Sequence, residues 1–293
     1  MKFGLTHGNM GRTSDPDTAW EMARAAEAAG FESLWTVDHA IIPTVYEKVY
    51  PETPDGHFPF PLDHPLADPL PWLTWVGAAT SRVKLGTAIL VLPQRNVVVT
   101  AKEAATVDRL TGGRLLLGVG AGWCREEFEA VGADFDSRGR RLREAVPALR
   151  ALWTGRPATY ESDSVSFTGV ITQPRPAGPT IPIHLGGFGT TAAARAGRIG
   201  DGFFPAGYGD LERLEMLIGR ARSAAAAAGR DPSEVEITTR WTRDPADVDI
   251  DVVHRLEELG VDRVTVPVFL FDADYLIEEI QRFGERYVLP YRS

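Results

Sequence analysis

The chain has 293 residues and a formal net charge of −9, with 44% hydrophobic and 24% charged residues, a composition ordinary for a globular protein. The negative charge argues against a nucleic-acid partner, because phosphate binding requires a basic surface. No uninterrupted apolar run approaches about 18 residues, so no membrane span is predicted. The single cysteine, Cys124, allows no intrachain disulfide, and we expect a cytoplasmic protein.

The first half of the chain alternates between strand-like and helix-like segments. The first helix is expected to begin at Pro16, behind the N-cap residue Asp15, and to stop before Gly30. The basic run 138–143 opens a later helix and is interpreted as a solvated helical face. Strands are predicted at residues 2–7, 33–37, 84–90 and 114–119, and helices at 16–28, 72–80, 100–110, 126–130 and 140–152.

Two longer segments interrupt this alternation. Residues from about 40 to 71 are rich in proline and in aromatic side chains. This segment is too aromatic for a disordered linker, and its composition favours a structured lid. Residues from about 157 to 172 alternate polar and apolar positions, with Tyr160, Val165 and Phe167 spaced as in a β-hairpin. We interpret both segments as insertions into a larger fold.

The second half continues the alternation to the end of the chain. Strands are predicted at residues 182–185, 202–205, 235–240 and 263–268, and helices at 190–198, 211–228, 248–259 and 273–283. The strands are continuously apolar, which is typical of parallel strands buried on both faces. Eight strands, each followed by a helix, predict a (β/α)8 TIM barrel, an α/β fold, as a single domain over residues 1–293.

Polar residues and glycines stand where several predicted strands end, and in a (β/α)8 barrel these ends form the active-site mouth. Asp38 and His39 follow the strand at 33–37. We interpret His39 as a group that accepts or donates a proton where charge develops, with a purely structural loop histidine as the alternative.

Two glycine-rich turns follow later strands. The turn at 118–122 does not match the dinucleotide-binding motif, because Trp123 stands where the motif has its third glycine. Its glycines, however, allow the backbone to approach a flat ring closely. The turn at 186–189 precedes a helix beginning at Thr190, whose unsatisfied N–H groups predict a phosphate site. His7, His184 and Trp241 also lie near strand ends, and packing is the alternative to chemistry for each. No close-spaced cluster of His, Asp or Glu predicts a metal site.

These motifs together resemble the bacterial luciferase-like family of flavin- and deazaflavin-dependent oxidoreductases, and within it the actinobacterial branch associated with coenzyme F420. The resemblance implies a TIM barrel with insertions, whose mouth holds the cofactor ring. It rests on residues 35–39, 85–93, 108–114, 118–123, 126–128, 186–189 and 200–204.

The resemblance also implies roles for individual residues. His39 and Asp38 would be catalytic, and relatives carry a non-proline cis peptide bond at the position of Ala88 and Ile89. The cofactor-binding residues that it implies are Ala88, Ile89, Gly120, Ala121, Gly122, Gly186, Gly187, Phe188, Gly189 and Thr190. We place His7, Trp123 and Trp241 on the substrate side.

The implied activity is hydride transfer between coenzyme F420 and a small organic substrate, whose identity and direction of reaction the sequence leaves open. Sugar-phosphate dehydrogenases of this superfamily carry a glutamate where this chain has Trp123, which argues for a more apolar substrate. Two alternatives stay open: an FMN-dependent monooxygenase that uses O2 and a separate reductase, and a non-catalytic flavin-binding barrel. The family often forms dimers through barrel helices, so a homodimer is also open.

Overall fold

The computed structural model describes residues 1–205, 210–240 and 250–292. One parallel sheet contains β1 (Lys2–Thr6), β2 (Ser33–Thr36), β3 (Lys84–Thr87), β4 (Leu90–Val91), β5 (Leu115–Gly120), β8 (Ile183–Gly187), β9 (Gly202–Pro205), β10 (Glu236–Arg240) and β11 (Arg263–Pro267). The order is β3-β2-β1-β11-β10-β9-β8-β5-β4, and β3 also pairs with β5, which closes the sheet. The predicted (β/α)8 barrel is confirmed.

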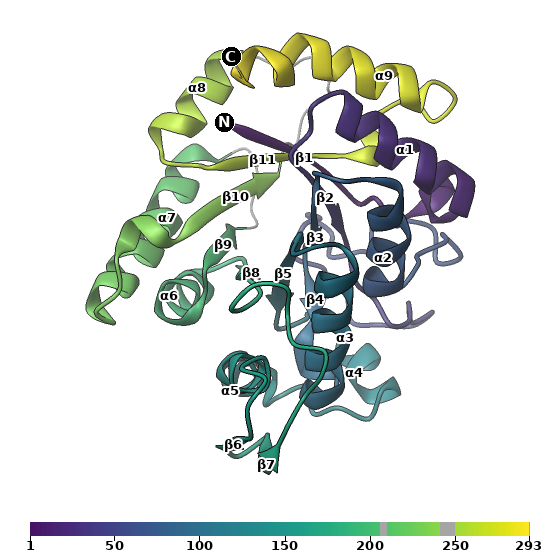
Figure 1. Cartoon of the computed structure of the whole chain (residues 1–293). Coiled ribbons are helices and arrows are strands. Elements are labelled where there is room, and N and C mark those ends of the chain that lie inside the picture. The colour runs from purple at the N-terminus through teal and green to yellow at the C-terminus, as the bar shows by residue number, and fades with distance from the viewer. Residues whose placement is uncertain (206–209, 241–249, 293) are drawn as a thin grey trace.

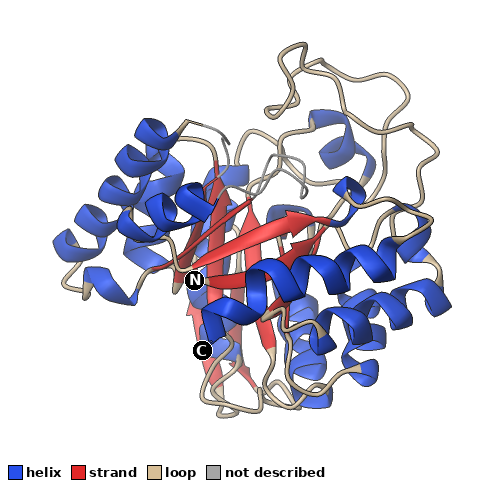
Figure 2. Cartoon of the chain, turned by 90° about the horizontal axis from the view of Figure 1, so that it is seen from above, coloured by secondary structure: helices blue, strands red, loops and turns tan. Residues whose placement is uncertain are grey.

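Helices surround this barrel on its outside (Figure 1). They are α1 (Pro16–Ala28), α2 (Pro69–Ala79), α3 (Val97–Leu110), α4 (Arg125–Ala130), α5 (Arg138–Leu152), α6 (Thr190–Ile199), α7 (Leu211–Ala227), α8 (Ile250–Glu258) and α9 (Leu276–Phe283). The antiparallel pair β6 (Ala158–Glu161) and β7 (Ser166–Val170) lies beyond α5, outside the ring of helices (Figure 1). Long loops gather on one side of the molecule in Figure 2.

The third barrel strand differs from the prediction, because it is divided into β3 and β4. The peptide bond between Ala88 and Ile89 is cis, at the position that the resemblance implies. Beyond it, Leu90 pairs with Val119 and Val91 pairs with Gly120, so β4 keeps its place beside β5. The nine strands of the sheet therefore fill the eight positions of the barrel.

Two helices begin earlier than predicted, because an N-cap residue precedes each of them. The carboxylate of Asp68 accepts a hydrogen bond from the Leu70 N–H, and α2 starts at Pro69. The side chain of Asn96 accepts from the N–H groups at the start of α3. Asp and Asn at this position satisfy backbone donors that a helix leaves unpaired. The helix predicted at residues 248–259 corresponds to α8, and residues 248 and 249 lie outside the described residues.

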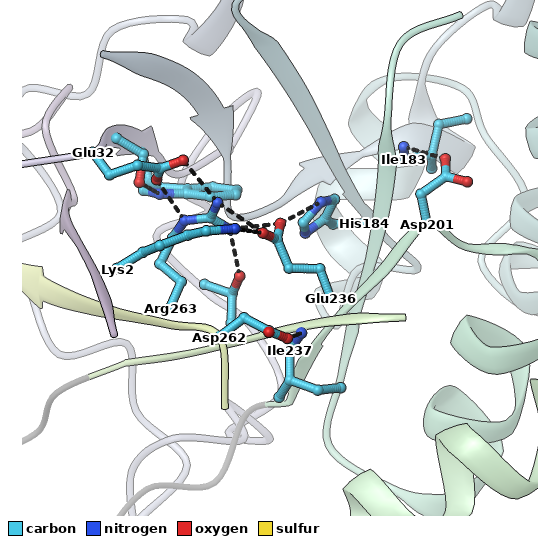
Figure 3. A network of polar contacts seen from close by, with 12 residues as sticks. Lys2, Glu32, Ile183, His184, Asp201, Glu236, Ile237, Asp262 and Arg263 are labelled. Carbon is cyan, nitrogen blue, oxygen red and sulfur yellow. Dashed lines mark hydrogen bonds and ion pairs between the residues drawn. The ribbon is translucent and has the colours of Figure 1, made fainter. Parts of the chain in front are cut away.

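A buried ionic network closes the amino-terminal end of the barrel (Figure 3). The side chain of Arg263 is 1% exposed and forms ion pairs with Glu32, at 2.7 Å from Nε to Oε2, and with Glu236, at 2.9 Å from Nη1 to Oε2. The Arg263 guanidinium also lies over the Trp35 ring, 5.4 Å from its centroid. Lys2 pairs with Glu236 as well. The network joins β1, β2, β10 and β11 at the end opposite to the mouth.

His184 lies inside the barrel against this network and not at the mouth. Its Nε2 is 3.4 Å from Glu236 Oε2, and its ring centroid is 6.0 Å from that of Trp35. Burial lowers the pKa of His184 to about 4, so the imidazole is neutral at neutral pH. Burial opposes ionisation of Glu236 too, but the charge and hydrogen bonds of Arg263 lower the pKa of Glu236 to about 2. These contacts favour packing over chemistry for His184.

The free energy of unfolding should therefore fall as the pH drops from about 7 to about 5. The folded pKa of His184, about 4, lies below its ordinary value of 6.5, so the unfolded chain binds more protons between these values. The free energy of unfolding that this histidine contributes is complete above pH 6.5 and decreases as the pH falls toward 4. At about pH 5 the loss amounts to roughly 2 kcal/mol. Urea unfolding at both pH values measures this loss.

The same measurement on two variants isolates the contribution of His184. His184→Gln should lose markedly less stability on acidification, whereas His254→Gln, at an exposed position on α8, should behave as the wild type. An unchanged pH dependence in His184→Gln would contradict the assignment.

Candidate active site at the mouth of the barrel

The predicted catalytic and cofactor-binding residues come from four neighbouring positions in the barrel. They lie at the ends of β2, β3, β5 and β8, and these strands are neighbours in that order around the closed sheet. Their carboxyl ends therefore meet at one edge. Several residues there keep part of their surface exposed, namely Ala88, Ile89, Ala121, Gly122, Gly186 and Gly187. We call this group the mouth floor.

His39 is held by a carboxylate that the sequence analysis did not assign. Its Nδ1 lies 3.2 Å from Oε2 of Glu127, and Oε1 of Glu127 accepts a hydrogen bond from the Ala40 N–H at 2.5 Å. Glu127 is 1% exposed, so its charge is fixed in place. A neutral His39 then carries its hydrogen on Nδ1, and Nε2 has no hydrogen-bond partner among the described residues.

Glu127 lies on α4, the short helix after β5, together with Glu126 and Glu129. The position of this helix near the mouth could be predicted from the sequence. Which of the three carboxylates turns inward could not, because α4 is only 6 residues long and shows no clear apolar stripe.

Asp38 lies behind the mouth floor. Its Oδ2 accepts from the Val91 N–H at 2.8 Å, and its Oδ1 pairs with Arg95 Nη2 at 2.9 Å. Arg95 also pairs with Asp68 at 2.8 Å. Burial raises the pKa of Asp38, and Arg95 opposes this shift. These contacts tie the end of β2 to β4, and they favour a positioning role over the catalytic role that the sequence predicts.

Glycines of β5 and β8 face Ile89 at the mouth floor. A Cβ atom on Gly186 would lie 2.6 Å from Ile89 Cγ2, and one on Gly120 would also overlap the Ile89 side chain. Gly122 has a φ of +80°, which a residue with a Cβ rarely adopts, and here the chain turns away toward α4. The strand ends therefore approach Ile89 closely, and no residue of the mouth floor carries a polar side chain.

The start of α6 fits an anion. Its N-cap is Gly189, with a φ of −139° and no side-chain cap, so the first N–H groups have no partner among the described residues. Gly189 and Thr190 line a surface cavity of about 530 Å³ together with Arg213 of α7, and the carboxylates of Asp210 and Glu212 line the same cavity. Arg213 Nη2 donates to the Phe188 carbonyl at 2.6 Å, which places a positive charge beside this turn. Free helix N–H groups and a nearby cation are suited to a phosphate.

Two aromatic rings contact His39, Phe58 from the predicted lid and Trp123 from the turn after β5. Phe58 meets the His39 ring edge-on at 5.3 Å between centroids, and Trp123 does so at 5.8 Å. Tyr50 packs on Trp123 at 5.1 Å. The same segment is fastened to the opposite side of the barrel, where Glu52 pairs with Arg240 of β10 at 2.7 Å. The lid therefore gives the mouth an aromatic cover.

Comparison with known proteins identifies the family. The sequence profile of the luciferase-like monooxygenases matches residues 1–243. The chain belongs to this family. An uncharacterized protein of Mycobacterium tuberculosis (strain ATCC 25618 / H37Rv) is 33% identical over 246 residues, which cover 84% of this chain and 83% of that protein.

Two further comparisons concern the cofactor and the fold. An F420-dependent glucose-6-phosphate dehydrogenase of Mycolicibacterium gilvum (strain PYR-GCK) is 36% identical over 235 residues, covering 77% of this chain and 65% of that enzyme. The crystal structure of monooxygenase RslO1 from Streptomyces bottropensis superposes with a TM-score of 0.79 at 21% identity, over 100% of both chains. The chain thus shares its fold with luciferase-like enzymes.

The substrate-side predictions have different outcomes in this luciferase-like barrel. Trp123 touches His39, as described above. His7 is 7% exposed, and its Nε2 lies 3.3 Å from Arg240 Nη1. Burial, and then the charge of Arg240, lower the pKa of His7 well below its ordinary value, so its ring is a neutral acceptor. Trp241 lies outside the described residues.

Among the described residues, no three His, Cys, Asp or Glu side chains lie together as a metal site. No helix in the described part of the chain combines the length and apolar character that crossing a membrane requires.

Proposed function

We propose that this luciferase-like protein is an F420-dependent oxidoreductase that transfers a hydride between the deazaflavin and a small, apolar organic substrate. The observation that carries the proposal is the juxtaposition of the His39–Glu127 pair, the apolar mouth floor and the uncapped start of α6, which follow neighbouring strands. The 36% identity to an F420-dependent dehydrogenase favours the deazaflavin over FMN.

The chain's own residues have separate tasks in this reaction. The N–H groups at the start of α6 bind the cofactor phosphate, and Ile89 with the facing glycines supports one face of the ring. When bound, the deazaflavin supplies a ring carbon that takes up or gives a hydride. His39 Nε2 moves the proton that accompanies the hydride, and Glu127 orients the imidazole and stabilises its protonated form. Asp38 holds β4 in place behind the ring.

The lid favours an apolar substrate. Trp123 and Phe58 both lie edge-on to His39, so a substrate that reaches His39 Nε2 contacts aromatic rings. Tyr46 and Tyr50 extend the aromatic surface around Trp123. A charged sugar phosphate would lose hydration against these rings without gaining a partner from them. The lid also excludes water from the reacting atoms.

An aspartate at the start of α6 should compete with the cofactor. Gly189 has an ordinary φ of −139°, and an added Cβ would meet nothing within 4 Å, so Gly189→Asp fits without strain. The new carboxylate caps the helix itself, which changes stability by only a few tenths of a kcal/mol, roughly. It occupies the N–H groups and repels the phosphate, so cofactor affinity should fall about tenfold or more. Isothermal titration measures the affinity.

Gly189→Ala is the matched control, because it adds the Cβ without the charge. It should bind cofactor nearly as the wild type does. Equal affinities of Gly189→Asp and Gly189→Ala would contradict phosphate binding at this helix.

Titration of the purified protein with F420 and with FMN, following ring fluorescence, tests the proposed function. The proposal predicts tighter binding of F420 and reduction or oxidation of the bound deazaflavin by a member of an apolar substrate panel. Exclusive binding of FMN, with substrate oxygenation when a reductase is added, would instead make the protein a monooxygenase. Tight cofactor binding with no turnover of any substrate would make it a flavin-binding barrel.

A further inference from the structure

His7 lies where β1 ends at the mouth, and its backbone conformation is uncommon. Its φ is +61°, and no other residue except glycine has a positive φ among the described residues. Side chains rarely adopt this conformation, and it persists where the surrounding structure enforces it, often at a functional site. The turn is held from β2, because the Asn9 amide donates to the Val37 carbonyl at 2.8 Å and accepts from the Val37 N–H at 2.9 Å. Val37 stands two positions before His39, so both histidines leave adjacent strands at the same edge.

One nitrogen of the His7 ring has a partner and the other has none. Nε2 lies 3.3 Å from Nη1 of Arg240, and a guanidinium only donates, so Nε2 is an acceptor. Burial and the charge of Arg240 hold the pKa of His7 well below its ordinary value, so the ring is neutral. The single hydrogen of the neutral imidazole is therefore on Nδ1. This N–H group is buried and has no hydrogen-bond partner among the described residues.

A buried N–H group without an acceptor is unfavourable, and proteins rarely leave one. The group has lost its hydration and gained no hydrogen bond in exchange, which a bound ligand would correct. His184 also has an unpaired Nδ1, but its ring lies inside the barrel against the ionic network. His7 instead combines an unpaired N–H with a position at the mouth, where a ligand would bind.

Aromatic rings of the lid connect His7 with His39. Phe58 lies 5.3 Å from His39 between ring centroids, and Phe60 lies 5.7 Å from Phe58. The His7 ring follows at 6.4 Å from Phe60, and Phe269, which comes after β11, meets it edge-on at 4.9 Å. The lid thus covers both imidazoles with one row of rings, and opening of the lid would uncover them together.

The charges around His7 favour a neutral acceptor over an anionic one. Arg240 pairs with Glu52 of the lid at 2.7 Å, and the two side chains are only 14% and 18% exposed. The guanidinium therefore already has a counter-charge. A carboxylate on the substrate would add a second negative charge near Glu52, and like charges repel strongly where little water screens them. A carbonyl or ether oxygen accepts the hydrogen bond without this repulsion.

We propose that the Nδ1–H group of His7 donates a hydrogen bond to a neutral oxygen of the substrate, away from the carbon that exchanges the hydride. Nε2 of neutral His39 is an acceptor and serves the reacting centre, so the two histidines recognise opposite kinds of group. The substrate is then an apolar molecule with an ester, ether or carbonyl oxygen beyond its reacting group, and not a plain hydrocarbon chain. This inference rests on the proposed function, because it defines the substrate class of the same site.

Binding of two probes to the F420-loaded protein tests this assignment. Methyl phenylacetate carries an ester, and butylbenzene has a similar length without any acceptor. Neither has an alcohol or a ketone for hydride transfer, so isothermal titration measures binding without turnover. The dissociation constant of butylbenzene divided by that of methyl phenylacetate defines the ester preference. Phenylacetate should bind more weakly than its methyl ester, because Glu52 repels the carboxylate.

Two variants of nearly equal size separate hydrogen bonding from a structural role. Asparagine places an N–H close to the position of histidine Nδ1 and tolerates a positive φ, so His7→Asn should keep the ester preference within about twofold. Leucine has nearly the shape of asparagine but no donor, so the preference should fall about tenfold in His7→Leu, which corresponds to about 1.4 kcal/mol. Both variants lack the acceptor for Arg240, so a role limited to that contact would change both alike. His57→Leu, at an exposed position of the lid, should keep the wild-type preference.

A measurement on the wild type covers the case in which His7→Leu does not fold at this φ. In protein with isotope-labelled histidine, the magnetic resonance signal of the His7 Nδ1 hydrogen is assigned by its absence from His7→Asn. It should move strongly when methyl phenylacetate binds, and much less with butylbenzene. Equal ester preferences in the wild type and His7→Leu, or a signal that the ester leaves unmoved, would overturn the inference and leave the proposed function intact. Failure of the wild type to bind F420 would instead refute the proposed function.

Discussion

Replacing His39 with alanine should lower kcat by about 10²- to 10⁴-fold while leaving the dissociation constant of the cofactor within about twofold. Glu127 holds Nδ1 of His39 at 3.2 Å, and His39 Nε2 has no hydrogen-bond partner among the described residues. The cofactor contacts proposed above come from the mouth floor and the start of α6, and these do not depend on the imidazole. Removing His39 therefore removes proton transfer and leaves binding. Steady-state kinetics and fluorescence titration of the same preparation measure the two effects.

Two further substitutions separate the proton-transfer role from a structural one. Glu127→Gln keeps an acceptor for the Nδ1 hydrogen but loses the charge, so kcat should fall less than in His39→Ala. Glu127→Ala removes both the acceptor and the charge, and it leaves the Ala40 N–H without its acceptor. Its kcat should therefore fall further than that of Glu127→Gln. Unchanged kcat in His39→Ala, or an equal loss of kcat and cofactor affinity, would remove His39 from the mechanism.

Arg263→Leu should reduce the free energy of unfolding by about 3–5 kcal/mol, which is the usual cost of breaking a buried ion pair by removing one partner. Arg263 contacts both carboxylate oxygens of Glu32 and of Glu236, and it also donates to Thr238 Oγ1 at 2.9 Å. Leucine has no donor for these groups, so two carboxylates would remain at the end of the barrel without their shared cation. Urea unfolding measures the loss.

The same substitution at an exposed ion pair provides the control. Arg255 pairs with Glu258 at 2.9 Å on α8, with side chains that are 52% and 66% exposed. Arg255→Leu should cost less than about 1 kcal/mol, because exposed ion pairs contribute little. Adding Glu32→Gln to Arg263→Leu should recover part of the stability, since Glu32 has no other cationic partner among the described residues, whereas Glu236 keeps Lys2. Similar losses in Arg263→Leu and Arg255→Leu would show that burial of the network contributes little.

The barrel could be predicted from the sequence because its determinants are local. Continuous apolar strands, helix caps such as Asp15 and glycine stops such as Gly30 each depend on a few neighbouring residues. Eight such strands that alternate with helices are compatible with few folds other than a (β/α)8 barrel. The order of the strands then follows, since consecutive units of this kind pack side by side.

The contacts of the site could not be predicted in the same way, because they join distant segments. His39 and Glu127 are separated by 88 positions, and Asp38 and Arg95 by 57. Sequence patterns indicated that Asp38 and His39 both stand at the mouth, but not that one turns behind the floor and the other toward the lid. The cis peptide bond between Ala88 and Ile89 was expected from the family resemblance alone, since no local pattern indicates it.

A crystal structure of the protein with bound F420 tests most directly whether a deazaflavin lies in the mouth of this barrel. The expected result is a ring in contact with Ala88 and Ile89, with His39 beside it and the phosphate on the N–H groups that begin α6. A cofactor bound elsewhere on the molecule, or a phosphate remote from Gly189 and Thr190, would contradict the proposed redox function.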